Sequence, residues 1–196
     1  MSRLDAKTIA VYDTQAKEYA ARRANRIEPG LTVFTPKLRQ GGHVLDLGCG
    51  PGDASVHFLK AGFTVDAVDA SASMVALTRE LGVNARQATF DQIDQVNAYD
   101  GIWASYSLLH AARSDMPDNL ARLRTALKPG GKLHIGLKLG SGESRDPIGR
   151  YYTYYALDEL IGLLETAGFT PEAWETEDAV GLDGKAYQGI WMHANG

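Results

Sequence analysis

Three glycines at alternate positions follow a short apolar run, in the segment Val44-Leu45-Asp46-Leu47-Gly48-Cys49-Gly50-Pro51-Gly52. Glycine lets the backbone approach a ligand without a Cβ in the way, and its N–H groups at the start of a helix favour negative charge. Asp69 stands at the end of the next apolar run, where a carboxylate can accept hydrogen bonds from both hydroxyls of a ribose. A tight turn between a strand and a helix also needs glycine, but the order of loop and acid favours a nucleoside-containing cofactor.

The spacing of these glycines distinguishes between two kinds of cofactor. Dinucleotide-binding loops have the pattern G-x-G-x-x-G, which counted from Gly48 requires a glycine where this chain has Asp53. An aspartate beside a pyrophosphate would bring like charges together. Asp46, just before the first glycine, suits a ligand with positive groups such as an ammonium or a sulfonium. We therefore expect a cofactor with a zwitterionic tail, and an NAD-dependent oxidoreductase is the less favoured alternative.

The elements that position these residues alternate along the chain between strand and helix patterns. Such alternation implies parallel strands with right-handed crossovers and helices on both faces. The sequence therefore predicts an α/β fold with a Rossmann-like, mostly parallel sheet of seven strands, the last of them antiparallel. Expected strands are 43–47, 64–69, 83–88, 101–105, 133–139, 169–175 and 186–193; expected helices are 5–26, 53–61, one capped by Ser71, one from a cap at Ser114 through Pro117 to Leu127, and 157–167.

The composition is that of an ordinary globular protein, with 196 residues, 44% of them hydrophobic and 22% charged. We expect one domain over 1–196, divided into a helical lid (1–30), a cofactor-binding core (43–139), and an insertion with the C-terminal part of the sheet (140–196). The net charge of -4 disfavours nucleic acid as a partner, although Arg22, Arg23 and Arg26 form a small basic cluster.

Several absences narrow the class of protein further. No apolar run approaches the roughly 20 residues that span a bilayer, and the N-terminus lacks the apolar core of a signal peptide. Cys49 is the single cysteine, so an internal disulfide is excluded. We therefore expect a cytoplasmic protein without a membrane partner. Because His and Cys residues are not clustered, we expect no metal site.

Four segments in this order resemble the motifs of the class I S-adenosylmethionine-dependent methyltransferases. Asp46 to Gly52 is similar to their first motif, and Val65-Asp66-Ala67-Val68-Asp69-Ala70-Ser71 is similar to the second. Tyr99-Asp100-Gly101-Ile102-Trp103 resembles the start of their fourth strand, and Leu127-Lys128-Pro129-Gly130-Gly131-Lys132-Leu133 resembles their turn into the fifth. The resemblance covers about residues 8 to 195. It implies S-adenosylmethionine as the cofactor and a small molecule as the methyl acceptor.

The resemblance also implies roles for individual residues around the cofactor. Asp46 and the Gly48 backbone would hold its methionine end, Asp69 its ribose, and Met74 its adenine. Tyr12 and Tyr19 belong to a segment similar to the Tyr-x-x-x-Ala-x-x-Tyr stretch that relatives fold over the cofactor. The complete set of expected cofactor residues is Tyr12, Tyr19, Asp46, Gly48, Cys49, Gly50, Gly52, Asp69, Ala70, Met74, Thr89, Phe90, Asp91 and Ala104.

The candidate catalytic residues are Tyr106 and His110, which both follow the expected fourth strand. Their segment resembles a family stretch whose last histidine faces the substrate in some members. Methyl transfer needs an aligned acceptor and can need a base for the acceptor proton, which His110 would supply. The alternative is that His110 only hydrogen-bonds its own loop.

Four tyrosines at 151, 152, 154 and 155 offer flat walls for an organic acceptor, and Arg145 or Arg150 would pair with a substrate carboxylate. The chain lacks the Asn/Asp-Pro-Pro-Tyr/Phe motif of similar enzymes that methylate bases. Two further alternatives stay open: a cofactor-binding regulatory module without catalysis, and an RNA or protein methyltransferase.

Overall fold

The computed structural model describes residues 5–23, 28, 30–181 and 183–196. Its main sheet has seven strands in the order β3-β2-β1-β4-β5-β9-β8. β9 runs antiparallel to both of its neighbours, β5 and β8, and the pairs among the first five strands are parallel. The predicted fold class is therefore confirmed. The strands are β1 (His43–Leu47), β2 (Thr64–Asp69), β3 (Ala85–Gln87), β4 (Tyr99–Ser105), β5 (Leu127–Lys138), β8 (Thr170–Val180) and β9 (Ala186–Asn195).

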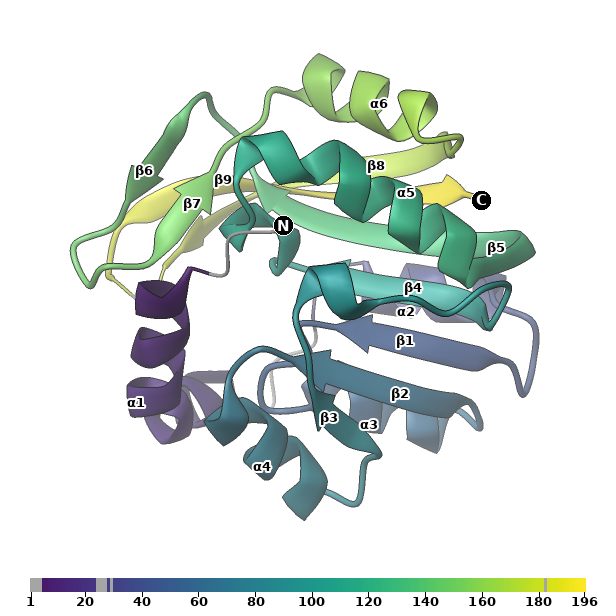
Figure 1. The fold of residues 1–196 in the computed structure, drawn as a ribbon, viewed down its shortest axis with the longest axis horizontal. Helices are drawn as coiled ribbons and strands as arrows, with labels where there is room; N and C mark the ends of the chain where they lie inside the picture. The colour runs from purple at the N-terminus through teal and green to yellow at the C-terminus, as the bar shows by residue number, and fades with distance from the viewer. Residues whose placement is uncertain (1–4, 24–27, 29, 182) are drawn as a thin grey trace.

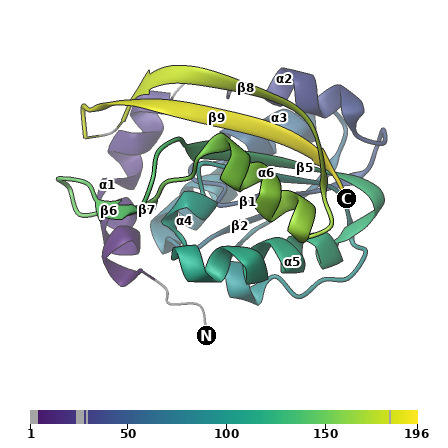
Figure 2. The same ribbon diagram turned by 90° about the horizontal axis from the view of Figure 1, so that it is seen from above.

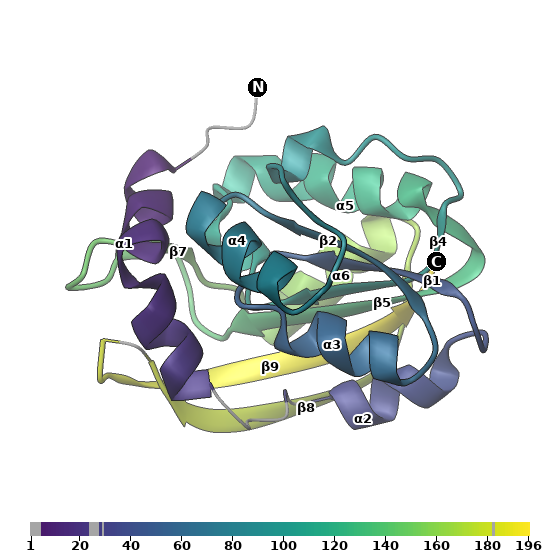
Figure 3. The same ribbon diagram turned by 90° about the horizontal axis from the view of Figure 1, so that it is seen from below.

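Helices cover both faces of this sheet (Figures 1, 2 and 3). On one face, Phe34, Phe58 and Val75 pack against Val44 and Trp103 of the strands. On the other face, side chains of α5 and α6 pack against Leu45, Ile102 and Leu133. The helices are α1 (Ala6–Arg23), α2 (Leu31–Phe34), α3 (Asp53–Lys60), α4 (Ala72–Glu80), α5 (Met116–Ala126) and α6 (Leu157–Thr166).

The candidate site lies where the sheet reverses its strand order. The chain passes from β1 outward to β2 and β3, and then returns to β4 on the other side of β1. Ligands of such sheets bind in the crevice outside the carboxyl ends of the strands at this point. α1 runs past these ends, and a two-stranded ribbon of β6 (Glu143–Arg145) and β7 (Tyr151–Thr153) lies beside it (Figure 1).

The structure differs from the predicted elements at the junction of α5 and β5. The expected helix reaches Leu127 and stops at Pro129, but α5 ends at Ala126 and Leu127 already pairs with Tyr99. Leu127 is completely buried, and an apolar residue is compatible with a buried helix as well as with a buried strand, so its apolar character does not distinguish the two. The prediction of Ser114 as the cap of this helix is wrong, because the residue at the N-cap position of α5 is Asp115. The Asp115 side chain makes no capping hydrogen bond.

Other differences are small. The Ser71 cap is confirmed, since its hydroxyl accepts a hydrogen bond from the Met74 amide (3.1 Å). α2 and the β6–β7 ribbon are not among the predicted elements. The end of the predicted helix 5–26, with Arg26, lies outside the described residues. Within the described part of the chain, no helix has the length and apolarity to cross a membrane, and no cluster of side chains suits a metal ion.

Candidate active site

The glycine loop after β1 is shaped by close approach of another loop. Gly48 and Cys49 both donate their amide hydrogens to the Val68 carbonyl of β2, at 2.8 and 2.9 Å. Gly48 has a φ of +77°, and a Cβ there would collide with the side chain of Ser107. This position therefore needs glycine. Cys49 is buried, and burial raises the pKa of its thiol, so it is a packing residue rather than a nucleophile.

Asp69 joins the glycine loop to the start of α4. Its carboxylate accepts the Gly50 amide and the Ser71 amide, each at 2.9 Å, through different oxygens. Burial raises the pKa of Asp69, and these backbone bonds act in the opposite direction. Each carboxylate oxygen keeps a further lone pair for a ligand, because a carboxylate has about four acceptor sites.

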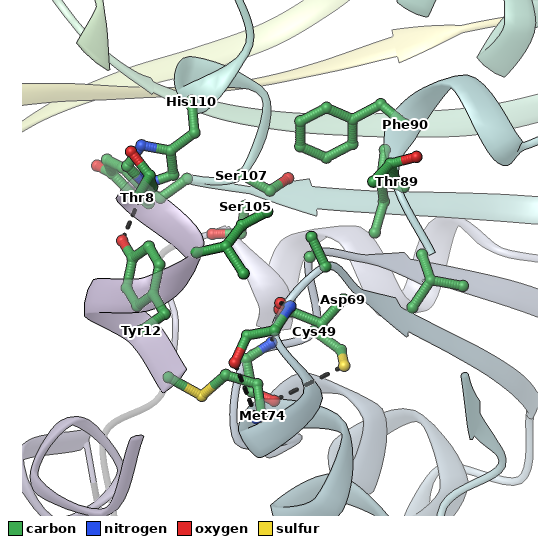
Figure 4. A pocket seen from close by; sticks show the side chains of 18 of the residues that line it. Thr8, Tyr12, Cys49, Asp69, Met74, Thr89, Phe90, Ser105, Ser107 and His110 are labelled. Carbon is green, nitrogen blue, oxygen red and sulfur yellow. Dashed lines mark hydrogen bonds between the residues drawn. The ribbon is translucent and has the colours of Figure 1, made fainter. Parts of the chain in front are cut away.

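A cavity of about 130 Å³ opens between the glycine loop, Asp69 and α1 (Figure 4). Thr8 and Tyr12 line it from α1, and Thr89 and Phe90 line it from the segment after β3. Twelve of the residues predicted from the sequence line this cavity, so residues far apart in the sequence surround one space. They are Tyr12, Tyr19, Gly48, Cys49, Gly50, Asp69, Ala70, Met74, Thr89, Phe90, Tyr106 and His110.

Four predicted cofactor residues are not among those that line this cavity: Asp46, Gly52, Asp91 and Ala104. Asp46 accepts a hydrogen bond from the Ser55 hydroxyl (2.6 Å), and burial raises its pKa to about 7. Gly52 precedes α3, Asp91 accepts from the Thr89 hydroxyl (2.5 Å), and Ala104 is completely buried within β4. The cavity as it stands is therefore formed without these four residues, and their contact with the cofactor stays a prediction.

α1 is fastened to the rest of the site near its middle and just before its first residue. Near its middle, Asp13 accepts hydrogen bonds from the Ser71 hydroxyl (2.6 Å) and the Ser73 amide (3.0 Å) at the start of α4. Just before α1, Asp5 forms an ion pair with Arg145 of the ribbon (2.7 Å). These contacts hold the aromatic face of α1 over the carboxyl ends of the strands.

His110 is partly buried and takes part in a chain of hydrogen bonds. Its Nδ1 lies 2.6 Å from the Tyr151 carbonyl oxygen, and its Nε2 lies 2.8 Å from the Tyr12 hydroxyl. Because a carbonyl only accepts, Nδ1 carries the proton, and Nε2 accepts from Tyr12. Burial lowers the pKa of His110 to about 4, so the ring is neutral at pH 7. Arg150 in turn donates to the Tyr12 hydroxyl at 3.2 Å.

A second cavity of about 340 Å³ continues beyond His110. Tyr106 lines both cavities; it follows β4 with a φ of +51°, and its hydroxyl donates to Glu177 (2.8 Å). A left-handed non-glycine residue is strained, a feature that concentrates at functional sites. Gly189 has no Cβ to collide with the Tyr106 hydroxyl.

Of the four tyrosines predicted as walls, Tyr152 lines this second cavity, whereas Tyr151, Tyr154 and Tyr155 do not. Tyr155 instead belongs to the core, with 1% of its surface exposed. Arg150 also lines the cavity and is ion-paired with Asp146 (2.7 Å). Arg145 is held by Asp5 and is not part of the lining.

Several residues that line the two cavities were not predicted from the sequence, among them Thr8, Ser107 and Lys138. Thr8 lines the first, and its spacing of one helical turn from Tyr12 could have indicated it. Ser107 also lines the first, and no local pattern indicates it. Lys138 lines the second, and a charged residue directly after the apolar run Leu133–Leu137 is a signal in the sequence that indicates it.

The fold and the site together define a class. The structure has the parts of a Rossmann-like site for a nucleoside-containing cofactor. They are a glycine loop after β1, an acid at the end of β2, and a crevice where the sheet reverses its strand order. A model of the family described as "Methyltransferase domain" matches residues 19–173. The chain belongs to this family, so the resemblance seen in its motifs is confirmed.

Two curated relatives are named for methyl transfer. The 27-O-demethylrifamycin SV methyltransferase of Amycolatopsis mediterranei (strain S699) is 27% identical over 161 residues, which are 70% of this chain and 57% of that protein. The dimethylglycine N-methyltransferase of Parasynechococcus marenigrum (strain WH8102) is 33% identical over 133 residues, 63% of this chain and 46% of that protein. The chain thus spans about half the length of these relatives.

A similar solved structure supports the fold assignment. It is the Burkholderia thailandensis 1,6-didemethyltoxoflavin-N1-methyltransferase with bound 1,6-didemethyltoxoflavin and S-adenosylhomocysteine. The TM-score is 0.77 at 22% identity, and the match covers 97% of this chain and 87% of that one. At this identity the likeness concerns the architecture, and the arrangement of strands and helices is shared over nearly the whole chain.

Proposed function

We propose that this protein transfers a methyl group from S-adenosylmethionine to a small organic acceptor. The observation that carries the proposal is that two cavities meet at Tyr106 and His110, one beside the glycine loop and the other lined by tyrosines. A cofactor in the first cavity and an acceptor in the second would be neighbours. Holding two reactants in line is the main requirement of a displacement at a methyl carbon.

The residues of the first cavity fit a nucleoside with a charged tail. The Ser107 hydroxyl is buried and lacks a hydrogen-bond partner among the described residues, although a buried polar group normally has one. Asp69 would hold the ribose, the Gly48–Gly50 backbone the methionine end, and Met74 and Phe90 the adenine. Bound there, the cofactor supplies a methyl group on a positively charged sulfur, which is the electrophile of the reaction.

His110 and Tyr106 would act on the acceptor side. The Nε2 of the neutral His110 ring accepts a hydrogen bond from the Tyr12 hydroxyl. A hydroxyl or amine of the substrate that takes the place of this hydroxyl beside Nε2 would pass its proton to the nitrogen. Tyr106, held by Glu177, would position the acceptor.

We further infer that residues 1–196 act as one domain with 1–30 as its lid, in a reducing cytoplasm. Neither a nucleic acid nor a membrane is a partner in this proposal, because the net charge is -4 and the second cavity has the volume of a small-molecule site.

Calorimetry with S-adenosylmethionine, S-adenosylhomocysteine and NAD tests the cofactor. We expect the first two to bind and NAD to bind much more weakly; equal or tighter binding of NAD would favour an oxidoreductase. A transfer assay with radiolabelled methyl groups and a panel of small hydroxyl, amine and acid acceptors then separates an enzyme from a regulatory module. Tight cofactor binding without transfer to any acceptor would contradict the catalytic part of the proposal.

A further inference from the structure

Lys138 is a buried cation at the carboxyl end of β5. It is the last residue of that strand and lines the second cavity, with 8% of its surface exposed. Its ammonium nitrogen lies 4.1 Å from the ring centre of Tyr152 and 4.2 Å from that of Tyr187. Two aromatic faces from different elements therefore flank this charge, Tyr152 from β7 and Tyr187 from β9.

No carboxylate of the described residues lies within ion-pair distance of Lys138. The nearby guanidinium of Arg150 has its own partner in Asp146, and Glu177 of the same cavity accepts from Tyr106. Burial lowers the pKa of Lys138, and the positive charge of Arg150 lowers it further, while Asp183 and Asp146 act in the opposite direction.

A buried ammonium without a counterion is unfavourable, because proteins normally pair the charges that they bury. Such a group in a cavity is a candidate for ligand binding. The simpler explanation is that the two tyrosine faces hold the ammonium by themselves through cation–π contacts. The two explanations differ in what they require of a ligand, since the first needs an anion and the second is indifferent to charge.

We propose that Lys138 is the counterion for an anionic oxygen of the acceptor, and that the acceptor is a flat aromatic or conjugated organic acid. This inference rests on the proposed function, because it assigns the acceptor class to the second cavity. Tyr152 and Tyr187 line the same cavity as Lys138, so the walls beside the ammonium are aromatic and suit a conjugated ring. Lys138 is in this sense a specificity-determining residue.

The test compares two probes of the same shape and different charge, 2-naphthoate and 2-naphthamide. Their binding is measured by calorimetry or by NMR titration with the protein saturated with S-adenosylhomocysteine. We expect the acid to bind at least about tenfold more tightly than the amide, a difference that corresponds to about 1.4 kcal/mol. Lys138→Met, which keeps the length and removes the charge, should abolish this preference and leave the affinity of the amide unchanged.

Lys60→Met is the matched control, since Lys60 is exposed at the end of α3 and its loss also removes one positive charge. This variant should keep the preference for the acid. Equal binding of the two probes to the unaltered protein, an unchanged preference in Lys138→Met, or no binding of either probe at millimolar concentration would each overturn the proposal. Affinity for S-adenosylhomocysteine is measured separately in every variant, so loss of folding or failure of the cofactor proposal is recognised as such.

Discussion

The Tyr12 hydroxyl and the His110 Nε2 lie 2.8 Å apart, although the two residues come from α1 and from the loop after β4. The rings also meet edge to face, with their centres 5.4 Å apart. On the other side of the imidazole, the Tyr151 carbonyl fixes the proton on Nδ1. The helix that covers the cofactor cavity therefore also occupies the one lone pair that a neutral His110 can offer to a proton.

Replacing His110 by Ala should reduce turnover by roughly a hundredfold or more while cofactor affinity is kept, if the ring is a general base. Steady-state kinetics and calorimetry on the same variant measure the two quantities. A modest change in both together would indicate that His110 only positions its loop.

Tyr12→Phe provides a second measurement on the same pair. Burial lowers the pKa of His110 to about 4, and the Tyr12 hydroxyl hydrogen-bonds the neutral form of the ring, so removal of this hydroxyl should raise the pKa. NMR titration of the imidazole follows this directly. A His110 pKa that is unchanged in Tyr12→Phe would mean that the hydroxyl does not control the protonation of the ring.

The sequence predicts the main sheet because its strands carry local signals. Apolar runs such as Val44–Leu47 and Leu133–Leu137 are buried on both faces, as parallel strands require. The β6–β7 ribbon carries no such signal, since Glu143–Arg145 is exposed and becomes a strand only by pairing with Tyr151–Thr153. Its formation depends on contacts between segments that have no apolar pattern of their own.

The sequence predicts well the parts of the candidate site that the backbone forms. It predicts poorly those parts in which the direction of a side chain determines its contacts. Gly48 and Asp69 follow from motif positions, and both line the cavity. Asp46 has a motif position too, but its carboxylate meets Ser55 of α3, since successive side chains of a strand point to opposite faces. The environment of Lys138 comes from Tyr152 and Tyr187, and the sequence of β5 does not specify those neighbours.

Replacing Asp69 by Ala should weaken cofactor binding by about 1.5–3 kcal/mol, as for a lost hydrogen bond to a charged group. The variant also loses the hydrogen bonds that Asp69 accepts from the Gly50 and Ser71 amides. The glycine loop and the start of α4 should therefore become less ordered. Asp66→Ala on the same strand is the control, because Asp66 does not line the cavity. Unchanged cofactor affinity in Asp69→Ala would place the ribose elsewhere.

Replacing Asp13 by Ala should loosen α1. The variant loses two hydrogen bonds to the start of α4, so amide hydrogens of α1 should exchange faster in the free protein. In the unaltered protein, added S-adenosylmethionine should slow exchange in α1, as expected for a lid over the cofactor. Protection that is equal with and without ligand would indicate a fixed structural helix.

The buried pair His134 and His193 should make the protein sensitive to acid. Their Nδ1 and Nε2 atoms lie 3.1 Å apart, and burial lowers the pKa of both, that of His193 to about 4. Both rings are therefore neutral in the folded state, while the unfolded chain takes up protons near pH 6.5. Their contribution to stability is complete above about pH 6.5 and is lost as the pH falls towards 4.

Urea unfolding between pH 4 and 7.5 measures this loss. In His193→Gln one titrating ring is absent, so the decrease in unfolding free energy over this interval should be smaller than in the unaltered protein by about 2 kcal/mol. An identical decrease in both proteins would show that His193 does not carry the acid sensitivity.

Asp46 should have the opposite pH dependence. Burial raises the pKa of its carboxyl to about 7, whereas an unfolded aspartate has a pKa of 3.8. Between about pH 4 and 7 the folded state therefore keeps a proton on Asp46 that the unfolded chain has lost. The contribution of this protonated carboxyl to the free energy of unfolding is complete below about pH 4 and is lost as the pH rises through 7. Asp46→Asn keeps an acceptor for the Ser55 hydroxyl and cannot ionise. It should become more stable relative to the unaltered protein as the pH rises from 4 to 8, by about 2–4 kcal/mol.

The same variant separates a structural Asp46 from one that acts on the cofactor. Because Asp46 accepts from Ser55 and does not line the cavity, Asp46→Asn should weaken S-adenosylmethionine binding less than Asp69→Ala does. The ammonium of a bound cofactor would still favour the ionised carboxylate, so binding near pH 7 should release protons in the unaltered protein and fewer in Asp46→Asn. Calorimetry in buffers of different ionisation enthalpy counts these protons. Equal proton release in both proteins would mean that Asp46 does not sense the cofactor's charge.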